Sequence, residues 1–445
     1  MKLLKHFLLI VITILLLCLS SQVQGEDTKP PSKPQEALNL EDLERMALEK
    51  NPTLAQAGAL VREAEGRKVQ AGLYPNPTFG YSGEEITVRH PSDKSQHHLF
   101  IEQKIITAGK LQRNREIFAQ EQARAEADLQ AQRQRVLNTV RITYFKALGA
   151  QRLVELRSEL AKIAREAVAI TEELFNIGQA DQPDILEAEI EAQWAELDLI
   201  NAGNELQKVW QMLAGVVGEP ALPKIRLLGD LEAEIPKLEQ EAIFKRILGE
   251  SPEIKSARAR IERARAAVER AKVQPIPDVF LRGGFGYDVE RLHDGRRAGA
   301  SGFVEIGIPI PLFDRNQGNI AAAMAELKFS EHEIRRLQLA LKVRLASVFK
   351  TYLSSSQAVE RYQKKILPKA QKAYELYLKS FQQMAAAYPQ VLIAQRTLFQ
   401  VRADYVHALV TVRQNVVEIE GLLLTDGLNE KSDLSVKEEI QSNKR

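Results

Sequence analysis

The side chains best suited to metal chemistry in this chain are histidines that lie near expected turns. Four of them flank the connections between candidate strands: His90, His97, His98 and His293. Imidazole is a common metal ligand, but these four are irregularly spaced and the only cysteine of the chain is Cys18. Solvated loop histidines explain the pattern more simply than a metal site does. We therefore expect no metal site and no bound cofactor.

A second candidate is a pair of carboxylates, Asp181 and Asp184, in a short break between two helical segments. Carboxylates at such a turn could favour cations. They could equally cap the next helix, because its first turn carries a partial positive charge. We favour the capping interpretation, which needs no further assumption. Gly178 suits the end of the preceding helix, where a positive φ is common, and Pro183 suits the first turn of the next.

Catalytic chemistry has no support in the sequence. There is no Ser-His-Asp order, no glycine-rich phosphate loop and no His-Glu-His cluster. Nucleic acid is also an improbable partner on charge grounds. With Lys2 and Lys5 assigned to a leader, the rest of the chain has 59 basic and 59 acidic residues. We expect neither an enzyme nor a nucleic-acid-binding protein.

Residues 1–25 have the layout of a secretory signal peptide: basic residues, the apolar run Phe7 to Leu17, then polar and small residues. The run is too short to span a bilayer as a helix. Cys18 could be lipidated, but Leu17 is larger than the residue expected there, so we assign Cys18 to the signal. At the other end, residues 428–445 form a polar tail.

The chain repeats itself with a period of about 200 residues. Matching landmarks are Asn51-Pro52 with Ser251-Pro252, Pro75-Asn76-Pro77 with Pro275-Ile276-Pro277, and Phe175 and Pro183 with Phe381 and Pro389. A period this long indicates a duplicated domain rather than a solenoid of short units.

Each repeat predicts the same order of elements. The first repeat, 26–225, has a helix, strands 78–86 and 98–106, a long helix 109–176 and a return helix 184–215. The second, 226–427, has a helix 251–274, strands 278–288 and 302–311, a long helix 316–383 with a kink at Pro368, and a return helix 390–424. Apolar residues three and four apart along the long helices predict packing along another helix. The fold class is mainly α with a small β part, built on long antiparallel helical hairpins.

The four strands alternate apolar and polar residues. One face of the second pair carries Val279, Leu281, Val304, Ile306 and Ile308. Strands of roughly ten residues match tilted membrane-spanning strands, but a barrel needs about eight of them. An open sheet edge in lipid would leave backbone groups unpaired, so other copies of the chain would have to complete the barrel. The alternative is a small soluble sheet that caps a helical bundle.

Several short motifs, in this order within the duplicated frame, resemble the TolC family of outer-membrane efflux channels. They are Asn51-Pro52, Gly72 to Pro77, Thr107 to Lys110, Asn176 to Gln179 and Pro311 to Arg315. The resemblance covers roughly residues 38–425 and is strongest to the branch associated with cobalt-zinc-cadmium resistance.

The resemblance implies a homotrimer in which each chain gives four strands to one transmembrane β-barrel, above a periplasmic α-barrel. It implies three further partners: a periplasmic adaptor (membrane fusion) protein, an inner-membrane pump, commonly proton-driven, and outer-membrane lipid. The tunnel tip and adaptor contact would then comprise Gly178, Asp181, Pro183, Asp184, Tyr388 and Pro389, and the lipid face Val279, Leu281, Val304, Ile306 and Ile308. The exported substrate stays open between metal cations, drugs and peptides. The rival function is a periplasmic coiled-coil adaptor or structural protein.

Overall fold

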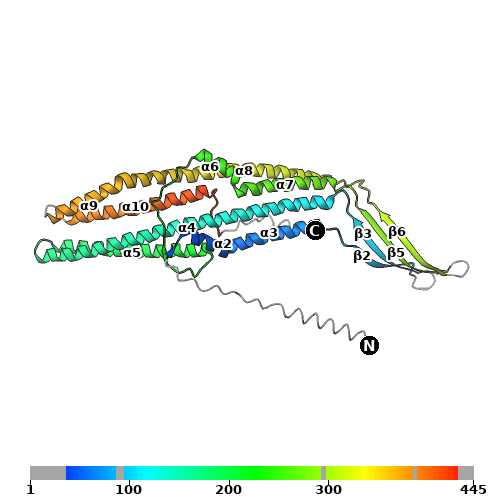
Figure 1. The fold of residues 1–445 in the computed structure, drawn as a ribbon, viewed down its shortest axis with the longest axis horizontal. Coiled ribbons are helices and arrows are strands. Elements are labelled where there is room, and N and C mark those ends of the chain that lie inside the picture. Colours follow the sequence, from blue (N-terminus) through cyan, green and yellow to red (C-terminus); the bar gives the residue numbers. More distant parts are fainter. Residues whose placement is uncertain (1–36, 87–94, 292–296, 384–387, 429–445) are drawn as a thin grey trace, which may run out of the picture.

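The computed structural model describes residues 37–86, 95–291, 297–383 and 388–428, and shows a rod of helices with a sheet at one end (Figure 1). The first repeat contains β1 (Ala37–Leu38), α2 (Leu40–Lys50), α3 (Pro52–Ala71), β2 (Thr78–Glu84), β3 (Gln96–Ile105), α4 (Lys110–Asn176) and α5 (Gln182–Val217). The second contains β4 (Arg226–Leu227), α6 (Gln240–Glu250), α7 (Pro252–Val273), β5 (Val279–Arg291), β6 (Arg297–Gly307), α8 (Gln317–Arg361), the π-helix η1 (Tyr362–Ile366), α9 (Leu367–Gln382) and α10 (Tyr388–Glu420).

Some of the sequence predictions fall outside these residues. The signal peptide 1–25 with Cys18, the histidines His90 and His293, and the polar tail beyond Leu428 are among them. They stay predictions.

Helix α4 runs without interruption for 67 residues, or roughly 100 Å. It lacks proline, and small residues let α5 approach it closely: Ala161 and Ala164 of α4 form one buried cluster with Ala192 and Ala195 of α5. Gly149, in the middle of α4, faces Val410 of α10, where an added Cβ would lie 2.2 Å from the Val410 side chain. This glycine therefore lets the two hairpins meet closely.

The long helix predicted for 316–383, with an irregularity at Pro368, is helical from Gln317 to Gln382, and its α-helical pattern is interrupted once. Helix α8 ends at Arg361, η1 follows over Tyr362–Ile366, and α9 begins at Leu367. The cause is Pro368, which has no N–H and whose ring clashes with the carbonyl four residues earlier, at Lys364. The α-helical hydrogen-bond ladder is therefore broken just before the proline, and the wider π turn takes its place.

Four antiparallel strands form one sheet in the order β2-β3-β5-β6. Phe79 lies opposite Ile101, Ile101 opposite Gly283, and Gly283 opposite Val304. The strand predicted for 302–311 is wrong at its end, because β6 stops at Gly307. Strand β5 begins at Val279, which this register would place opposite Ile308, so residues 309–311 have no partner strand within the described chain.

The main core lies in the middle of the rod, where α2, α6 and the short pair β1-β4 surround the long helices. Leu43, Leu213 and Ile247 are fully buried there. The link between the two repeats is fixed to this core: the Arg413 guanidinium donates to the carbonyls of Leu231, Ala233 and Glu234. The two repeats are thus held as one body.

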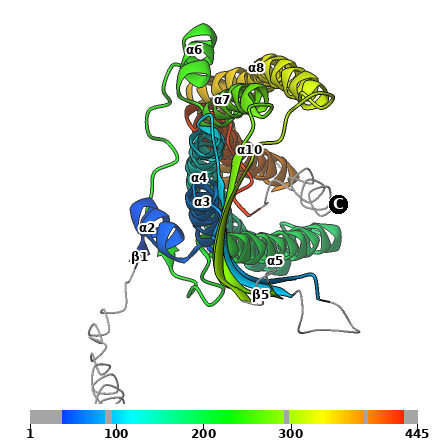
Figure 2. The same ribbon diagram turned by 90° about the vertical axis from the view of Figure 1, so that its right-hand side faces the viewer.

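The helices form a curved layer rather than a closed bundle when the molecule is seen end-on (Figure 2). Near the sheet the neighbours run α3, α4, α7, α8, and toward the hairpin tips they run α5, α4, α10, α9. Two helices therefore lie at the edges of the layer at each end, α3 and α8 near the sheet and α5 and α9 near the tips.

Candidate functional site: the sheet, its junction and the hairpin tips

One face of the sheet is apolar and exposed in the single chain. Phe285 is 73% exposed and Val304 is 77% exposed, although both belong to regular strands. The other exposed members of this outer face are Phe79, Tyr81, Leu99, Ile101, Ile105, Leu281, Tyr287 and Ile306. Their positions alternate along each strand and match across it, which gives one continuous apolar surface. A surface of this kind needs an apolar covering.

Aromatic side chains lie toward both ends of the outer face. Tyr81 and Tyr287 flank His97 near the tips of the strands, and the Tyr81 hydroxyl lies 2.5 Å from His97 Nδ1. Below the sheet, Tyr74 and Phe313 are 68% and 91% exposed. Tyrosine and other aromatic residues at two levels, with aliphatic residues between them, are typical of a membrane-spanning β-sheet.

The interpretation of His97 and His98 as loop histidines is wrong, because both belong to β3 and point to opposite faces. His98 is buried, and its Nε2 lies 2.9 Å from Ser301 Oγ. Among the residues that the structure describes, no group of three or more His, Cys, Asp or Glu side chains could hold a metal ion.

The opposite, inner face of the sheet carries charge. Glu102, Arg282 and Glu305 form one row across three adjacent strands. Arg282 lies over the ring of Phe100, and its guanidinium carbon is 4.1 Å from the ring centroid. Arg282 Nη1 is 3.8 Å from Glu305 Oε2. The ring of Phe100 lies flat on Gly80, where a Cβ would come within 2.5 Å of it. The inner face thus carries charged side chains, and its large side chains Phe100 and Arg282 lie along the sheet.

An ionic cluster joins the sheet to the helices. Asp278, the residue before β5, accepts hydrogen bonds from Lys110 Nζ at 2.8 Å and Thr107 N at 3.1 Å, and Lys104 Nζ lies 3.3 Å away. The Lys110 side chain is only 4% exposed and also donates to the carbonyl of Ile276. Burial opposes ionisation of Asp278, but the bonds from Lys110, Thr107 and Lys104 outweigh it and hold the pKa of Asp278 below its usual range.

At the first hairpin tip, the predicted residues build the turn between α4 and α5. Gly178 has φ +77° and ends α4. Asp181 and Asp184 form a capping box: Asp184 Oδ2 accepts from Asp181 N at 2.9 Å, while the Asp181 side chain accepts from the backbone N–H of Asp184. Pro183 occupies the first turn of α5. The two carboxylates are therefore engaged with the backbone.

At the second tip, Tyr388 and Pro389 open α10, and residues 384–387 lie outside the described chain. The two tips lie at the end of the rod opposite the sheet (Figure 1). The six predicted tip residues are thus brought to one end of the molecule, and their contact with another protein stays a prediction.

A family model described as outer membrane efflux protein matches residues 43–219 and 243–423, one match in each repeat. The chain belongs to the outer membrane efflux protein family. As a member of this family of channels, the protein is an efflux channel of the outer membrane, with its helical part in the periplasm. The family assignment favours the channel over the rival periplasmic adaptor.

This efflux channel is 28% identical over 401 residues to a curated relative, the cobalt-zinc-cadmium resistance protein CzcC of Cupriavidus metallidurans, with 88% of this chain and 92% of the relative covered. Its fold is that of solved channels. It matches CusC with a TM-score of 0.73 at 18% identity, covering 91% of this chain and 96% of that one. It matches the VceC outer membrane protein of Vibrio cholerae with a TM-score of 0.70 at 20% identity, covering 87% and 96%.

No helix in the described part of this efflux channel is both long and apolar enough to cross a membrane. The strands, by contrast, carry the continuous apolar face described above.

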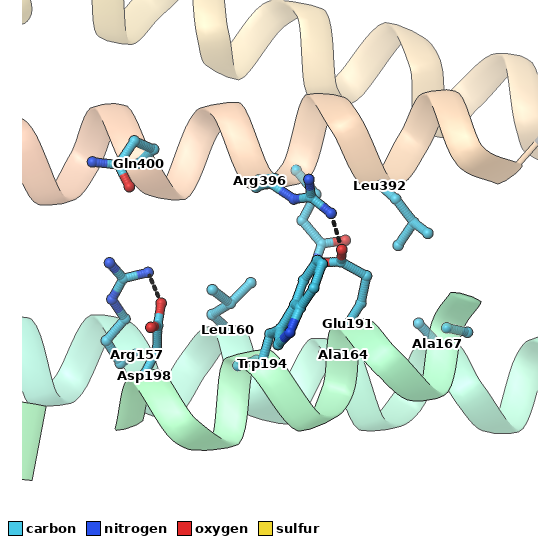
Figure 3. A pocket seen from close by; sticks show the side chains of 13 residues that line it. Arg157, Leu160, Ala164, Ala167, Glu191, Trp194, Asp198, Leu392, Arg396 and Gln400 are labelled. Carbon is cyan, nitrogen blue, oxygen red and sulfur yellow. Dashed lines mark hydrogen bonds and ion pairs between the residues drawn. The ribbon is translucent and has the colours of Figure 1, made fainter. Parts of the chain in front are cut away.

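The structure of this efflux channel adds a groove between its two hairpins that the sequence did not reveal (Figure 3). The groove encloses about 290 Å³ between α4, α5 and α10. Arg396 of α10 pairs with Glu191 of α5 across it, and Arg157 pairs with Asp198 at 2.8 Å. Trp194 is 55% exposed on the groove wall. No local pattern marks these residues, because Glu191 and Arg396 come from different repeats.

Proposed function

We propose that three copies of this chain form one continuous exit duct, which receives metal cations from a periplasmic adaptor and an inner-membrane pump. The trimer is supported by the four-stranded sheet, which has an apolar outer face and whose edge strands, β2 and β6, pair with no further strand of the described residues. Four strands cannot close a barrel and an open edge is costly in lipid, whereas three sets of four strands close one. Val279, Leu281, Val304, Ile306 and Ile308 then contribute to the lipid face.

The two edge helices near the tips support the same assembly through charge. Residues 182–200 of α5 contain six Asp or Glu and no Lys or Arg. Three of the six pair with arginines of α4 or α10: Glu191, Glu196 and Asp198. The other three, Asp184, Glu187 and Glu189, lie nearest the tip. Helix α9 contains Lys369, Lys372 and Lys379 against one acid, Glu375. Exposed apolar side chains accompany the charges on both helices: Leu186, Ile190, Trp194 and Leu197 on α5, and Leu376 and Tyr377 on α9. An acidic edge and a basic edge, each with apolar side chains, suit head-to-tail contact between copies.

The hairpin tips are the surface that we propose for the adaptor, with Gly178, Asp181, Pro183, Asp184, Tyr388 and Pro389 as contact residues. They lie at the end of the rod away from the membrane, within reach of periplasmic proteins (Figure 1). The name of the relative that this chain resembles, a cobalt-zinc-cadmium resistance protein, supports metal cations as the proposed cargo. One row of the inner face has two carboxylates, Glu102 and Glu305, against one guanidinium, Arg282, and is compatible with cations.

Assembly and location are tested together by fractionating cells and running outer-membrane material on a denaturing gel with and without boiling. We expect a trimer band in the unboiled sample that boiling converts to monomer. A monomer in the periplasmic fraction would refute the duct.

Cargo is tested by deleting the gene and measuring cellular Co²⁺, Zn²⁺ and Cd²⁺ with and without complementation. We expect accumulation that the wild-type chain reverses and that a variant retained in the cytoplasm, lacking residues 1–25, does not. Unchanged metal content together with an intact trimer would leave the duct standing and refute the cargo.

A further inference from the structure

The two unpaired edges of the sheet present their backbone groups at alternate residues. In an antiparallel ladder each residue directs both its N–H and its C=O to the same side, and successive residues alternate sides. Val289 N donates to Ser95 O, so odd-numbered residues of β5 and β3 bond to each other. It follows from the pairings that even-numbered residues of β5 bond to odd-numbered residues of β6, and even-numbered residues of β3 to even-numbered residues of β2.

The groups left facing outward are therefore those of even-numbered residues on β6 and odd-numbered residues on β2. On β2 these are Phe79, Tyr81 and Gly83, and on β6 and its extension they include Ile306, Ile308 and Ile310. All of these also belong to the apolar outer face or continue its alternation. Any pairing between the two edges must therefore oppose an odd-numbered residue of β2 and an even-numbered one of β6.

The two prolines after β6 stand at positions whose backbone groups face β5, not the free edge. Pro309 and Pro311 have no N–H, and a proline in a ladder removes one hydrogen bond. Both are odd-numbered, so each lacks an N–H group on the side that faces β5. Strand β5 does not extend beyond Val279 on this side, so no ladder hydrogen bond is lost there. If the alternation of β6 continues, the N–H groups of Ile308 and Ile310 face the free edge, while the Ile310 carbonyl also accepts a bond from Leu312 N at 2.9 Å. Residues 308–310 are thus competent to extend β6 against a strand on that edge, although no strand in the described part of the same chain lies there.

The internal repeat fixes which residues would meet. Phe280 lies opposite Gly307 and Gly80 lies opposite Phe100. Phe280 of β5 corresponds to Gly80 of β2, because the two are 200 positions apart. Their partners therefore correspond as well: Gly307 of β6 corresponds to Phe100 of β3, 207 positions earlier. Within the chain Phe100 also lies opposite Gly284. The same pairing between copies puts Gly307 opposite residue 84, since 284 less 200 is 84.

We propose that β6 of one copy extends to Ile310 and pairs antiparallel with β2 of the next copy, with Gly307 opposite Glu84 and Ile310 opposite Tyr81. This inference rests on the proposed trimer and adds the register of its seam. It agrees with the alternation of backbone groups, because the pair Ile310 and Tyr81 joins an even-numbered to an odd-numbered residue. It agrees with the faces as well, since Ile310 and Tyr81 are 75% and 58% exposed and both continue the outer face. The strand that the sequence predicts to 311 then forms on assembly.

Paired cysteines test the register. In this register Gly307 and Glu84 are a non-hydrogen-bonded pair, with Cα atoms about 4.5 Å apart, which a disulfide can bridge. A cysteine at Gly307 meets no obstacle, because the nearest atom to an added Cβ is Phe280 Cβ at 3.8 Å. The two residues lie on opposite edges of one sheet, so any disulfide must join two copies. The matched control combines Gly307→Cys with Ser82→Cys, which would be a diagonal pair about 7 Å or more apart.

After mild oxidation and boiling without reductant, we expect covalent dimers and trimers from Glu84→Cys/Gly307→Cys, at least fivefold less from Ser82→Cys/Gly307→Cys, and none from each single variant. The single variants also report any contribution of the native Cys18. A second pair, Tyr81→Cys/Ile310→Cys, tests the same register if the first pair fails to assemble. An intact unboiled trimer without the expected cross-links, or with stronger cross-links from the control, would overturn the register and leave the proposed function standing. Absence of any trimer in the wild type would refute the proposed function and the seam with it.

Discussion

Removal of the Asp278 carboxylate should destabilise the junction between sheet and helices more than removal of any exposed ion pair. In Asp278→Ala, Lys110 keeps only the carbonyl of Ile276 as a partner, and its side chain is 4% exposed. Breaking a buried ion pair typically costs about 3–5 kcal/mol, and we expect about 3 kcal/mol here because Asp278 is 11% exposed and Lys110 retains one acceptor. The matched control is Glu155→Ala, whose partner Arg152 is 64% exposed, with an expected cost of about 0.5 kcal/mol.

The assay is thermal unfolding of the purified channel in detergent, followed by circular dichroism. With an unfolding entropy of about 2.1 cal/mol/K per residue, a loss of about 3 kcal/mol lowers the melting temperature of a chain of 445 residues by about 3 °C. The control variant Glu155→Ala should lower the melting temperature by less than about 1 °C.

The effect should also depend on pH with a defined sign. The pKa of Asp278 is lowered in the folded protein, so its stabilisation is present above its unfolded pKa of about 3.9 and disappears as the pH falls through the lower folded value. The difference between wild type and Asp278→Ala should be constant from about pH 5 to 8 and shrink below about pH 4. Equal costs for Asp278→Ala and Glu155→Ala, or a difference that persists unchanged at pH 3, would refute the reasoning.

Three further predictions address the outer face, the first tip and the free edge. Ile306→Arg should cost about 2–4 kcal/mol in lipid and reduce the trimer band of unboiled outer-membrane extracts, whereas Glu305→Gln, on the inner face, should leave the amount of trimer unchanged. Gly178→Ala should weaken the first hairpin by about 1 kcal/mol through its φ of +77° alone, because no atom lies within 4 Å of an added Cβ, and limited proteolysis should cut the tip faster. Ile310→Pro removes an N–H that faces the free edge and should lower the temperature at which the trimer dissociates, while Pro309→Ala should not.

The sequence predicted those features that repeat or alternate along the chain. The first long helix was expected over 109–176 and lies at Lys110–Asn176, because an unbroken seam and the absence of proline leave no other local choice. An irregularity near Pro368 was expected as well. The π turn over Tyr362–Ile366 was not, because a periodic pattern does not report how the backbone accommodates the lost hydrogen bond.

The features that the sequence did not reveal depend on contacts between distant segments. Asp278 and Lys110 are 168 positions apart and meet only because β3 pairs with β5. The end of β6 was misplaced for a related reason: the alternation continues to Ile310, but a strand also needs a partner, and β5 begins too late to supply it. His98 looked like a loop residue because its burial depends on Ser301 and Phe303 of β6.

The π-helix also affects how far the two hairpins extend from the membrane. Each long helix can be measured from the residue before its start to the matching phenylalanine near its end. This segment runs from Gly109 to Phe175 in the first repeat and from Asn316 to Phe381 in the second, so the second segment is one residue shorter. A π turn takes up one more residue with little gain in length, so the second path is shorter by about two residues, or about 3 Å. The three first tips of a trimer would then project farther into the periplasm than the three second tips. A docking protein would meet two alternating levels instead of a flat ring.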